Sequence, residues 1–158
     1  MKRAIAYVSD IILGRTGEVI SREEQRDRIT KYAAEKGVEI VRWFEDRMYN
    51  EELMERAGVQ ALLACDEPVD MILVERVWSF SRSWPRLEDL FKTIDRKGLT
   101  LAAATTMWDC ISQMARRRYD LTIPGPGRHP VVRREEVEMP AIRRPRKLQF
   151  THLYQQAR

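Results

Sequence analysis

The sequence predicts an α/β fold, a small three-layer domain with a mainly parallel four-stranded sheet, followed by an irregular basic C-terminal tail. Short apolar runs alternate with amphipathic segments over about the first two thirds of the chain. This order is typical of βαβ units, because parallel neighbours need a crossover helix. The apolar runs contain few polar residues, as in strands that are covered on both faces. Beyond residue 110 the chain becomes rich in proline and arginine.

The first strand and the first helix have clear signals. Residues 3–8 (RAIAYV) form a short apolar run with high β-propensity, followed by a loop. Ser21 and Glu24 fit a capping box, in which the serine hydroxyl accepts an early helical N–H. We therefore expect a helix over residues 22–36, with Gly37 as its stop.

Three further strands and two helices follow. Residues 38–44 are predicted to form the second strand, and residues 53–64 a helix that follows a polar loop starting at Asp46. Residues 71–74 (MILV) are predicted to form the third strand, and residues 99–105 the fourth. Between them lies a helix with Pro85 in its first turn, where the missing N–H costs nothing. Its apolar residues recur at helical spacing: Leu87, Leu90, Phe91 and Ile94.

The positive charge of the chain lies in its C-terminal part. Residues 1–110 contain 17 Lys/Arg and 20 Asp/Glu, a net charge of −3, whereas residues 111–158 contain 11 and 4, a net charge of +7. Five of the seven prolines also follow residue 110, and proline at that density breaks helices and removes ladder donors. We expect a folded domain over residues 1–108 and a Pro/Arg-rich, partly irregular tail over residues 109–158, with short helical turns near residues 112–118 and 148–156.

The composition excludes several classes of function. No apolar run approaches the roughly 20 residues of a bilayer crossing, and the N-terminus lacks a cleavage pattern, so we expect a cytoplasmic protein. Cys65 and Cys110 lack the paired spacing of a zinc site, and both histidines fall in the tail. Gly14 and Gly17 belong to no phosphate-binding or dinucleotide motif. We therefore expect no metal, no cofactor and no membrane contact.

Seven sequence pieces follow one another in a recognisable order. They are AIAYV (4–8), SREEQR (21–26), FED (44–46), RAGVQ with LL (56–63), VDMILV (69–74), FSRS (80–83) and KGLTL (97–101). This succession resembles the catalytic domain of resolvase/invertase-type serine recombinases over about residues 3–106. The resemblance implies a resolvase-like fold, a function in DNA recombination, and a setting related to mobile elements or prophages.

The resemblance also implies a chemistry. In that family a serine attacks a DNA phosphodiester to form a 5′-phosphoserine linkage, while arginines neutralise the phosphate. The first strand of the family continues as Tyr-x-Arg-x-Ser. Counted without gaps from Tyr7, Ser9 takes the arginine position and Ile11 the nucleophile position, and isoleucine cannot attack a phosphate. A two-residue deletion would instead place Ser9 at the nucleophile position. We prefer the ungapped register because it keeps the family's spacing to Gln25, and the arginine is absent in both registers.

Two further loops depart from the family pattern. The serine-glycine pair that precedes the second loop's arginine is replaced by Asn50 and Glu51, while Arg56 is retained. The third loop, Asp-Arg-Leu-Ser-Arg in the family, is WSFSR over residues 78–82, which keeps Arg82 and loses the Asp-Arg pair. The loss of several groups that act as a unit lowers a rate by orders of magnitude. No long dimerisation helix and no groove-reading module follow in the sequence.

The candidate site residues form two groups. The candidate catalytic residues are Ser9, Arg56 and Arg82. The candidates for phosphate or DNA binding are Gln25, Arg82, Arg116, Arg117, Arg118, Arg143, Arg144, Arg146 and Lys147.

Each of the core candidates has a structural alternative. Ser9 is alternatively an ordinary strand-end hydroxyl, and Arg56 an ion-pair partner of Asp46 or another surface acid. Arg82 is alternatively a cap or an ion pair at the start of the third helix, and Gln25 a structural residue on the surface of its helix. Trp78 and the neighbouring phenylalanine form either an exposed apolar patch or part of the core.

Three functions stay open at this point. We expect a catalytically degenerate, recombinase-derived module that binds DNA weakly or without sequence specificity, with a protein partner or a homo-oligomer as further options. The first alternative is an active site-specific recombinase that cleaves DNA through a phosphoserine at Ser9. The second is a protein-interaction module that binds no nucleic acid.

Overall fold

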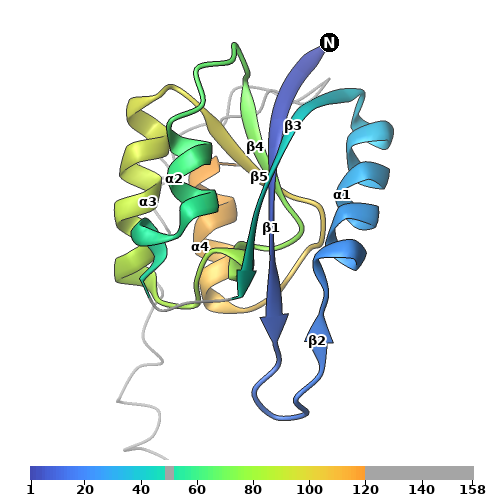
Figure 1. Cartoon of the computed structure of the whole chain (residues 1–158), viewed down its shortest axis with the longest axis vertical. Helices are drawn as coiled ribbons and strands as arrows, with labels where there is room; N and C mark the ends of the chain where they lie inside the picture. Colours follow the sequence, from blue (N-terminus) through green and yellow to red (C-terminus); the bar gives the residue numbers. More distant parts are fainter. Residues whose placement is uncertain (49–51, 120–158) are drawn as a thin grey trace, which may run out of the picture. The chain divides into compact units, whose positions relative to one another are not determined.

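Four parallel strands form the central sheet of the computed structural model, which describes residues 1–48 and 52–119. They are β1 (Lys2–Ile12), β3 (Val38–Met48), β4 (Met71–Val74) and β5 (Thr100–Ala103). Their order across the sheet is β3-β1-β4-β5. A two-residue strand, β2 (Val19–Ile20), pairs antiparallel with the end of β1. The predicted mainly parallel four-stranded sheet is confirmed, and β2 adds a short fifth strand (Figure 1).

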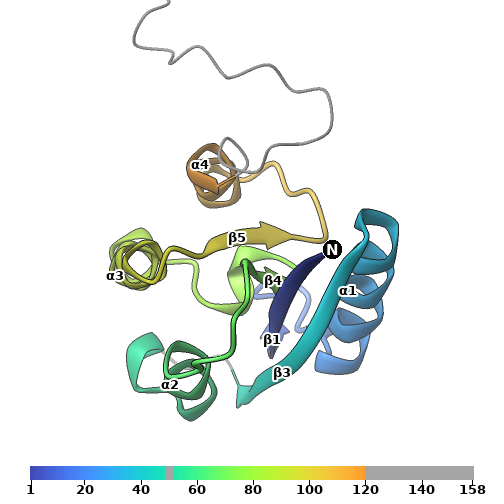
Figure 2. The ribbon, with the colours of Figure 1, turned by 90° about the horizontal axis from the view of Figure 1, so that it is seen from above.

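Helices cover both faces of this sheet (Figure 2). The helices are α1 (Arg22–Lys36), α2 (Ala57–Leu63), α3 (Trp84–Arg96) and α4 (Cys110–Tyr119), with short 3-10 turns η1 (Leu53–Glu55) and η2 (Val77–Ser79). On one face, the small side chains of Ala4 and Ala6 let Ile29 and Ala33 of α1 pack closely on β1. The opposite face carries a larger core made with α2, α3 and α4. The predicted three layers are therefore confirmed.

The sequence signals for α1 and α3 are confirmed. The Ser21 hydroxyl accepts the N–H of Glu24 at 3.1 Å, and Gly37 ends α1 with a φ of 65° that side chains rarely adopt. Pro85 lies in the first turn of α3. The four apolar residues predicted to share one face of α3 are all buried: Leu87, Leu90, Phe91 and Ile94.

Two strands extend beyond their predicted ends. β1 continues to Ile12 and β3 to Met48, whereas the sequence placed a loop after residue 8 and a polar loop from Asp46. The reason is mutual pairing, since Ser9 lies opposite Asp46 and the ladder continues to Asp10. Polar residues are tolerated there because one strand satisfies the backbone groups of the other.

The helix predicted over residues 53–64 is interrupted. Arg56 has extended backbone angles, with φ −63° and ψ 131°, and separates η1 from α2. Its side chain points inward to backbone carbonyls that follow β4. The apolar pattern of this segment is helical, but the hydrogen bonds of one buried arginine decide its backbone conformation.

The first part of the predicted tail is folded. Asp109 accepts the N–H of Ser112 at 3.0 Å at the start of α4. Ala115 and Tyr119 of this helix are buried, and the Tyr119 ring packs edge-on against Phe91 at 5.3 Å. The described chain therefore continues its core past the expected boundary at residue 108. Over the described residues no helix is long and apolar enough to cross a membrane.

Candidate functional site

Ser9 lies in β1 near the carboxyl ends of the parallel strands, the edge where open α/β sheets bind their ligands. Its side chain is completely buried. Its hydroxyl donates a hydrogen bond to the backbone carbonyl of Ser79 in η2, with an oxygen–oxygen distance of 2.5 Å. Ile11, which holds the nucleophile position in the ungapped register, is also buried. Neither side chain presents a group to solvent.

Gln25 connects three backbone segments around Ser9. Its amide nitrogen donates to the carbonyls of Ser9 at 2.6 Å and of Ile20 at 3.0 Å, and its amide oxygen accepts the hydroxyl of Ser79 at 3.0 Å. The side chain is fully buried. The expectation that Gln25 lies on the helix surface is therefore wrong: the amide is buried and forms hydrogen bonds with these buried groups.

Arg56 reaches the same point from the other face of the sheet. Its Nη1 donates to the Ser79 carbonyl at 3.1 Å and to the Tyr7 hydroxyl at 3.3 Å, and its Nη2 donates to the carbonyl of Phe80 at 2.7 Å. The side chain is only 5% exposed. The Ser79 carbonyl thus accepts from both Ser9 and Arg56. The guanidinium of Arg56 is therefore buried and does not lie on the protein surface.

The carboxylate of Asp46 accepts hydrogen bonds from three other residues. It accepts the Tyr7 hydroxyl at 2.8 Å and the N–H groups of Gly58 and Val59 at the start of α2. Burial raises the pKa of Tyr7 above its ordinary value, although the hydrogen bond from Arg56 acts in the opposite direction. Tyr7 therefore stays a neutral donor to Asp46.

Arg82 lies outside this buried network. It is exposed, and its guanidinium carbon lies 4.0 Å from the centre of the Trp78 ring. The Trp78 indole N–H donates to Asp109 at 3.2 Å. Trp78 is half-buried and Phe80 fully buried, where Phe80 stacks on Tyr7 at 4.7 Å between ring centres. Of the three candidate catalytic residues, Ser9 and Arg56 meet at one carbonyl, while Arg82 stacks on an indole.

The candidate phosphate-binding arginines of α4 have different surroundings. Arg116 donates to the Met107 carbonyl at 2.6 Å and lies 5.3 Å from the centre of the Trp108 ring. Arg117 is exposed, and Arg118 forms an ion pair with Asp95. The remaining candidates lie outside the described residues, as do Asn50 and Glu51: Arg143, Arg144, Arg146 and Lys147.

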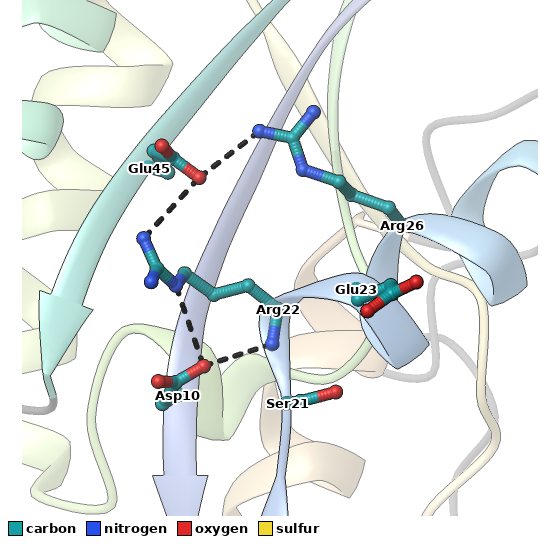
Figure 3. A pocket seen from close by; sticks show the side chains of 6 residues that line it. All are labelled: Asp10, Ser21, Arg22, Glu23, Arg26 and Glu45. Carbon is teal, nitrogen blue, oxygen red and sulfur yellow. Dashed lines mark hydrogen bonds and ion pairs between the residues drawn. The ribbon is translucent and has the colours of Figure 1, made fainter.

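A pocket of about 400 Å³ opens beside Asp10, between the ends of β1 and β3 and the start of α1 (Figure 3). Its lining residues are Asp10, Ser21, Arg22, Glu23, Arg26 and Glu45. Arg22 bridges Asp10 and Glu45, each at 3.4 Å, and Arg26 binds Glu45 at 3.0 Å. Three carboxylates against two guanidiniums give the pocket a negative balance. A phosphate entering it would meet arginines that already hold carboxylates.

A second buried cluster surrounds Glu75, which follows β4 directly. Its fully buried carboxylate accepts from Arg76 at 2.5 Å, from Arg28 at 2.9 Å and from Thr105 at 2.7 Å. Desolvation raises the pKa of Glu75, but these hydrogen bonds outweigh it and hold the pKa below its ordinary value. The sequence offered one signal for this cluster, an acid-arginine pair after a wholly apolar strand. The sequence contains no signal for the role of Ser79, because the group that accepts from Ser9 and Arg56 is its backbone carbonyl.

The sequence model of the resolvase N-terminal domain matches residues 16–121, more than half of the chain. The chain belongs to the resolvase family. No curated protein matches the sequence. The family match begins after β1, so the strand that carries Ser9 and Ile11 lies outside it. It also extends through α4, beyond the range of about 3–106 expected from the sequence pieces.

Solved structures of serine recombinases share the fold of this resolvase-family chain. The N-terminal catalytic domain of TP901-1 integrase is 23% identical with a TM-score of 0.56, over 74% of this chain and 88% of that one. A resolvase family site-specific recombinase from Streptococcus pneumoniae is 14% identical with a TM-score of 0.52, over 99% of each chain. At these identities the likeness establishes the fold alone, and any chemistry has to be inferred from the residues of this chain.

Proposed function

We propose that this resolvase-family chain does not cleave DNA and acts instead as a DNA-associated binding or regulatory module. One observation carries the proposal: the hydroxyl of Ser9, the serine of β1, is buried and donates to a backbone carbonyl. The other hydroxyl of this strand, that of Tyr7, is also buried and donates to Asp46. A nucleophile must reach its phosphorus atom in line with the leaving group. Ser9 would have to leave its strand environment to do so.

The surroundings of Ser9 support the same proposal. Phosphoryl transfer needs positive groups aimed at the oxygens of the reacting phosphate. Arg56 donates two of its described hydrogen bonds to the carbonyls of Ser79 and Phe80, and Arg82 stacks on Trp78. The pocket lined by Asp10, Arg22 and Glu45 has a negative balance. These groups stabilise the fold in the arrangement described and do not form a phosphate cradle.

The DNA-associated part of the proposal rests on charge and family. Residues 111–158 carry a net charge of +7, and their arginines can contact phosphates with salt-dependent, sequence-independent affinity. The family to which the chain belongs binds DNA and forms oligomers. We propose weak or non-specific DNA binding, with a protein partner or a second copy as a further contact.

The alternative of an active recombinase is favoured by one observation, the meeting of Ser9 and Arg56 at the Ser79 carbonyl. Incubation of the full chain with supercoiled plasmid, followed by denaturing separation, distinguishes the two functions. We expect no covalent protein–DNA adduct and no nicked plasmid. An adduct that forms with the native chain and with Ser83→Ala, and is abolished by Ser9→Ala, would overturn the proposal.

Salt-dependent binding to duplex DNA tests the DNA-associated part. Each phosphate contact changes the slope of log K against log salt by about 0.9. Full-chain variants in which Arg143, Arg144, Arg146 and Lys147 become glutamine should bind more weakly and with a shallower slope than the native chain. If the native chain has no affinity for DNA at low salt, the DNA-associated function is wrong and a protein-interaction module takes its place.

A further inference from the structure

Two tryptophan–arginine pairs lie next to each other on one surface of the domain. We call this the tryptophan–arginine surface; it comprises Trp78, Arg82, Trp108, Arg116 and Arg117. The Arg82 guanidinium carbon lies 4.0 Å from the centre of the Trp78 ring, and that of Arg116 lies 5.3 Å from the centre of the Trp108 ring. Asp109 joins the pairs, because it follows Trp108 in the chain and accepts the indole N–H of Trp78.

The indole of Trp108 is largely exposed and takes no part in the hydrophobic core. Its side chain is 76% exposed, and it belongs to neither of the two core clusters. Burial of an indole is strongly favourable. An exposed tryptophan therefore marks an interaction surface more often than an exposed small apolar residue does. Arg116 is held over the ring by its hydrogen bond to the Met107 carbonyl at 2.6 Å. The pair is thus arranged before any ligand arrives.

The surface also has a positive balance. α4 contains three consecutive arginines and no acid. The nearby Asp109 carboxylate is engaged by Trp78 and by Ser112. Desolvation raises the pKa of Asp109, but the hydrogen bonds outweigh it and hold the pKa below its ordinary value, so this group stays an acceptor.

A contrasting pair lies between α1 and β3. Arg26 lies 4.9 Å from the centre of the Trp43 ring, but the same guanidinium binds Glu45 beside the acidic pocket. A cation–π pair alone is therefore not distinctive in this chain. What distinguishes the tryptophan–arginine surface is the combination of an exposed indole face with an adjoining helix, α4, that contains three arginines and no acid.

We propose that the tryptophan–arginine surface binds unpaired nucleotides of single-stranded DNA. A base stacks on the Trp108 face opposite Arg116, and Arg82 and Arg117 contact phosphates of the same strand. Stacking on aromatic rings combined with a basic groove is the general mode of single-strand binding. A duplex offers no base face to an indole, because its bases are stacked on one another. The inference rests on the proposed DNA association and names the form of DNA that this surface takes.

Fluorescence anisotropy with a labelled 20-nucleotide single strand and with the matching duplex tests the inference on the full chain. Trp108→Ala should weaken single-strand binding at least about fivefold, as loss of one base–aromatic stack does. Trp108→Phe should keep most of the affinity, because phenylalanine keeps a stacking face. Trp43→Ala is the matched control and should bind the single strand like the native chain. The effect of Trp108→Ala on duplex binding should be smaller than its effect on the single strand.

The outcomes separate this inference from the proposed function. If Trp108→Ala binds the single strand as tightly as Trp43→Ala does, or if single strand and duplex lose affinity equally, the inference is wrong and DNA association stands. If the native chain binds the duplex at low salt and leaves the single strand unbound, the inference again fails alone. If it binds neither, both are wrong, and the surface is left as a protein contact.

Discussion

Replacement of Gln25 by alanine removes the amide that joins β1, β2 and η2. The carbonyls of Ser9 and Ile20 lose a donor, and the Ser79 hydroxyl loses an acceptor. Each buried polar group left without a partner costs about 1–3 kcal/mol. The hydroxyl can rotate and water can enter the space of the lost side chain, so we expect a total near the lower end, about 3–5 kcal/mol. That is a large part of the roughly 5–15 kcal/mol that stabilises a domain.

Urea unfolding followed by tryptophan fluorescence measures this loss. Gln60→Ala is the matched control, because Gln60 is an exposed helical glutamine with a single 3.3 Å hydrogen bond to the Met54 carbonyl. Its free energy of unfolding should stay within about 0.5 kcal/mol of the native value. If Gln25→Ala costs as little as Gln60→Ala, Gln25 is not a structural member of the Ser9 network, and the reasoning is refuted.

Two further predictions concern packing and pH. Gly58→Ala should lower the free energy of unfolding by about 1–3 kcal/mol, because its Cβ would lie 2.3 Å from the Glu45 carbonyl oxygen. Gly14→Ala is the control and should be nearly neutral, because its Cβ would have nothing within 4 Å. Equal unfolding midpoints of the two variants in urea would contradict this prediction. Glu75→Gln should cost about 3–5 kcal/mol, because it leaves Arg76 buried without its carboxylate. The folded-state pKa of Glu75 is lowered, so its contribution is present above the ordinary pKa of 4.5 and is lost as pH falls through the folded value. Native stability should therefore decline on acidification more steeply than that of the variant, and parallel stability–pH curves would contradict the assignment.

The parts of the fold that follow from local chemistry could be predicted. The hydroxyl of Ser21 caps α1 and the left-handed Gly37 ends it, both of which are set by neighbours in sequence. The stripe from Leu87 to Ile94 fixes the buried face of α3 in the same way. The helical turn expected near residues 112–118 is part of α4, but the burial of this helix could not be predicted, because it depends on contact with Phe91, which is distant in sequence.

The candidate site was less predictable for a related reason. The residue types of Ser9, Gln25 and Arg56 suit both phosphate chemistry and hydrogen bonding to backbone carbonyls. The partners of these three side chains are set by the position of Ser79, which depends on the path of η2. Its carbonyl accepts from Ser9 and Arg56, and its hydroxyl donates to Gln25. The family resemblance correctly indicated the fold, and the burial of these side chains could not be inferred from it.

The Ser9 hydroxyl is buried inside the fold, and its accessibility can be measured directly. Ser9→Cys in a chain that also carries Cys65→Ala and Cys110→Ser makes that position the single thiol, and its rate of reaction with a maleimide under native conditions reports its accessibility. Ile12→Cys in the same background is the control, since Ile12 lies on the same strand and is 49% exposed. We expect the thiol at position 9 to react only as fast as the domain unfolds, and the thiol at position 12 to react at once. Equal rates at the two positions in the folded protein would contradict this expectation.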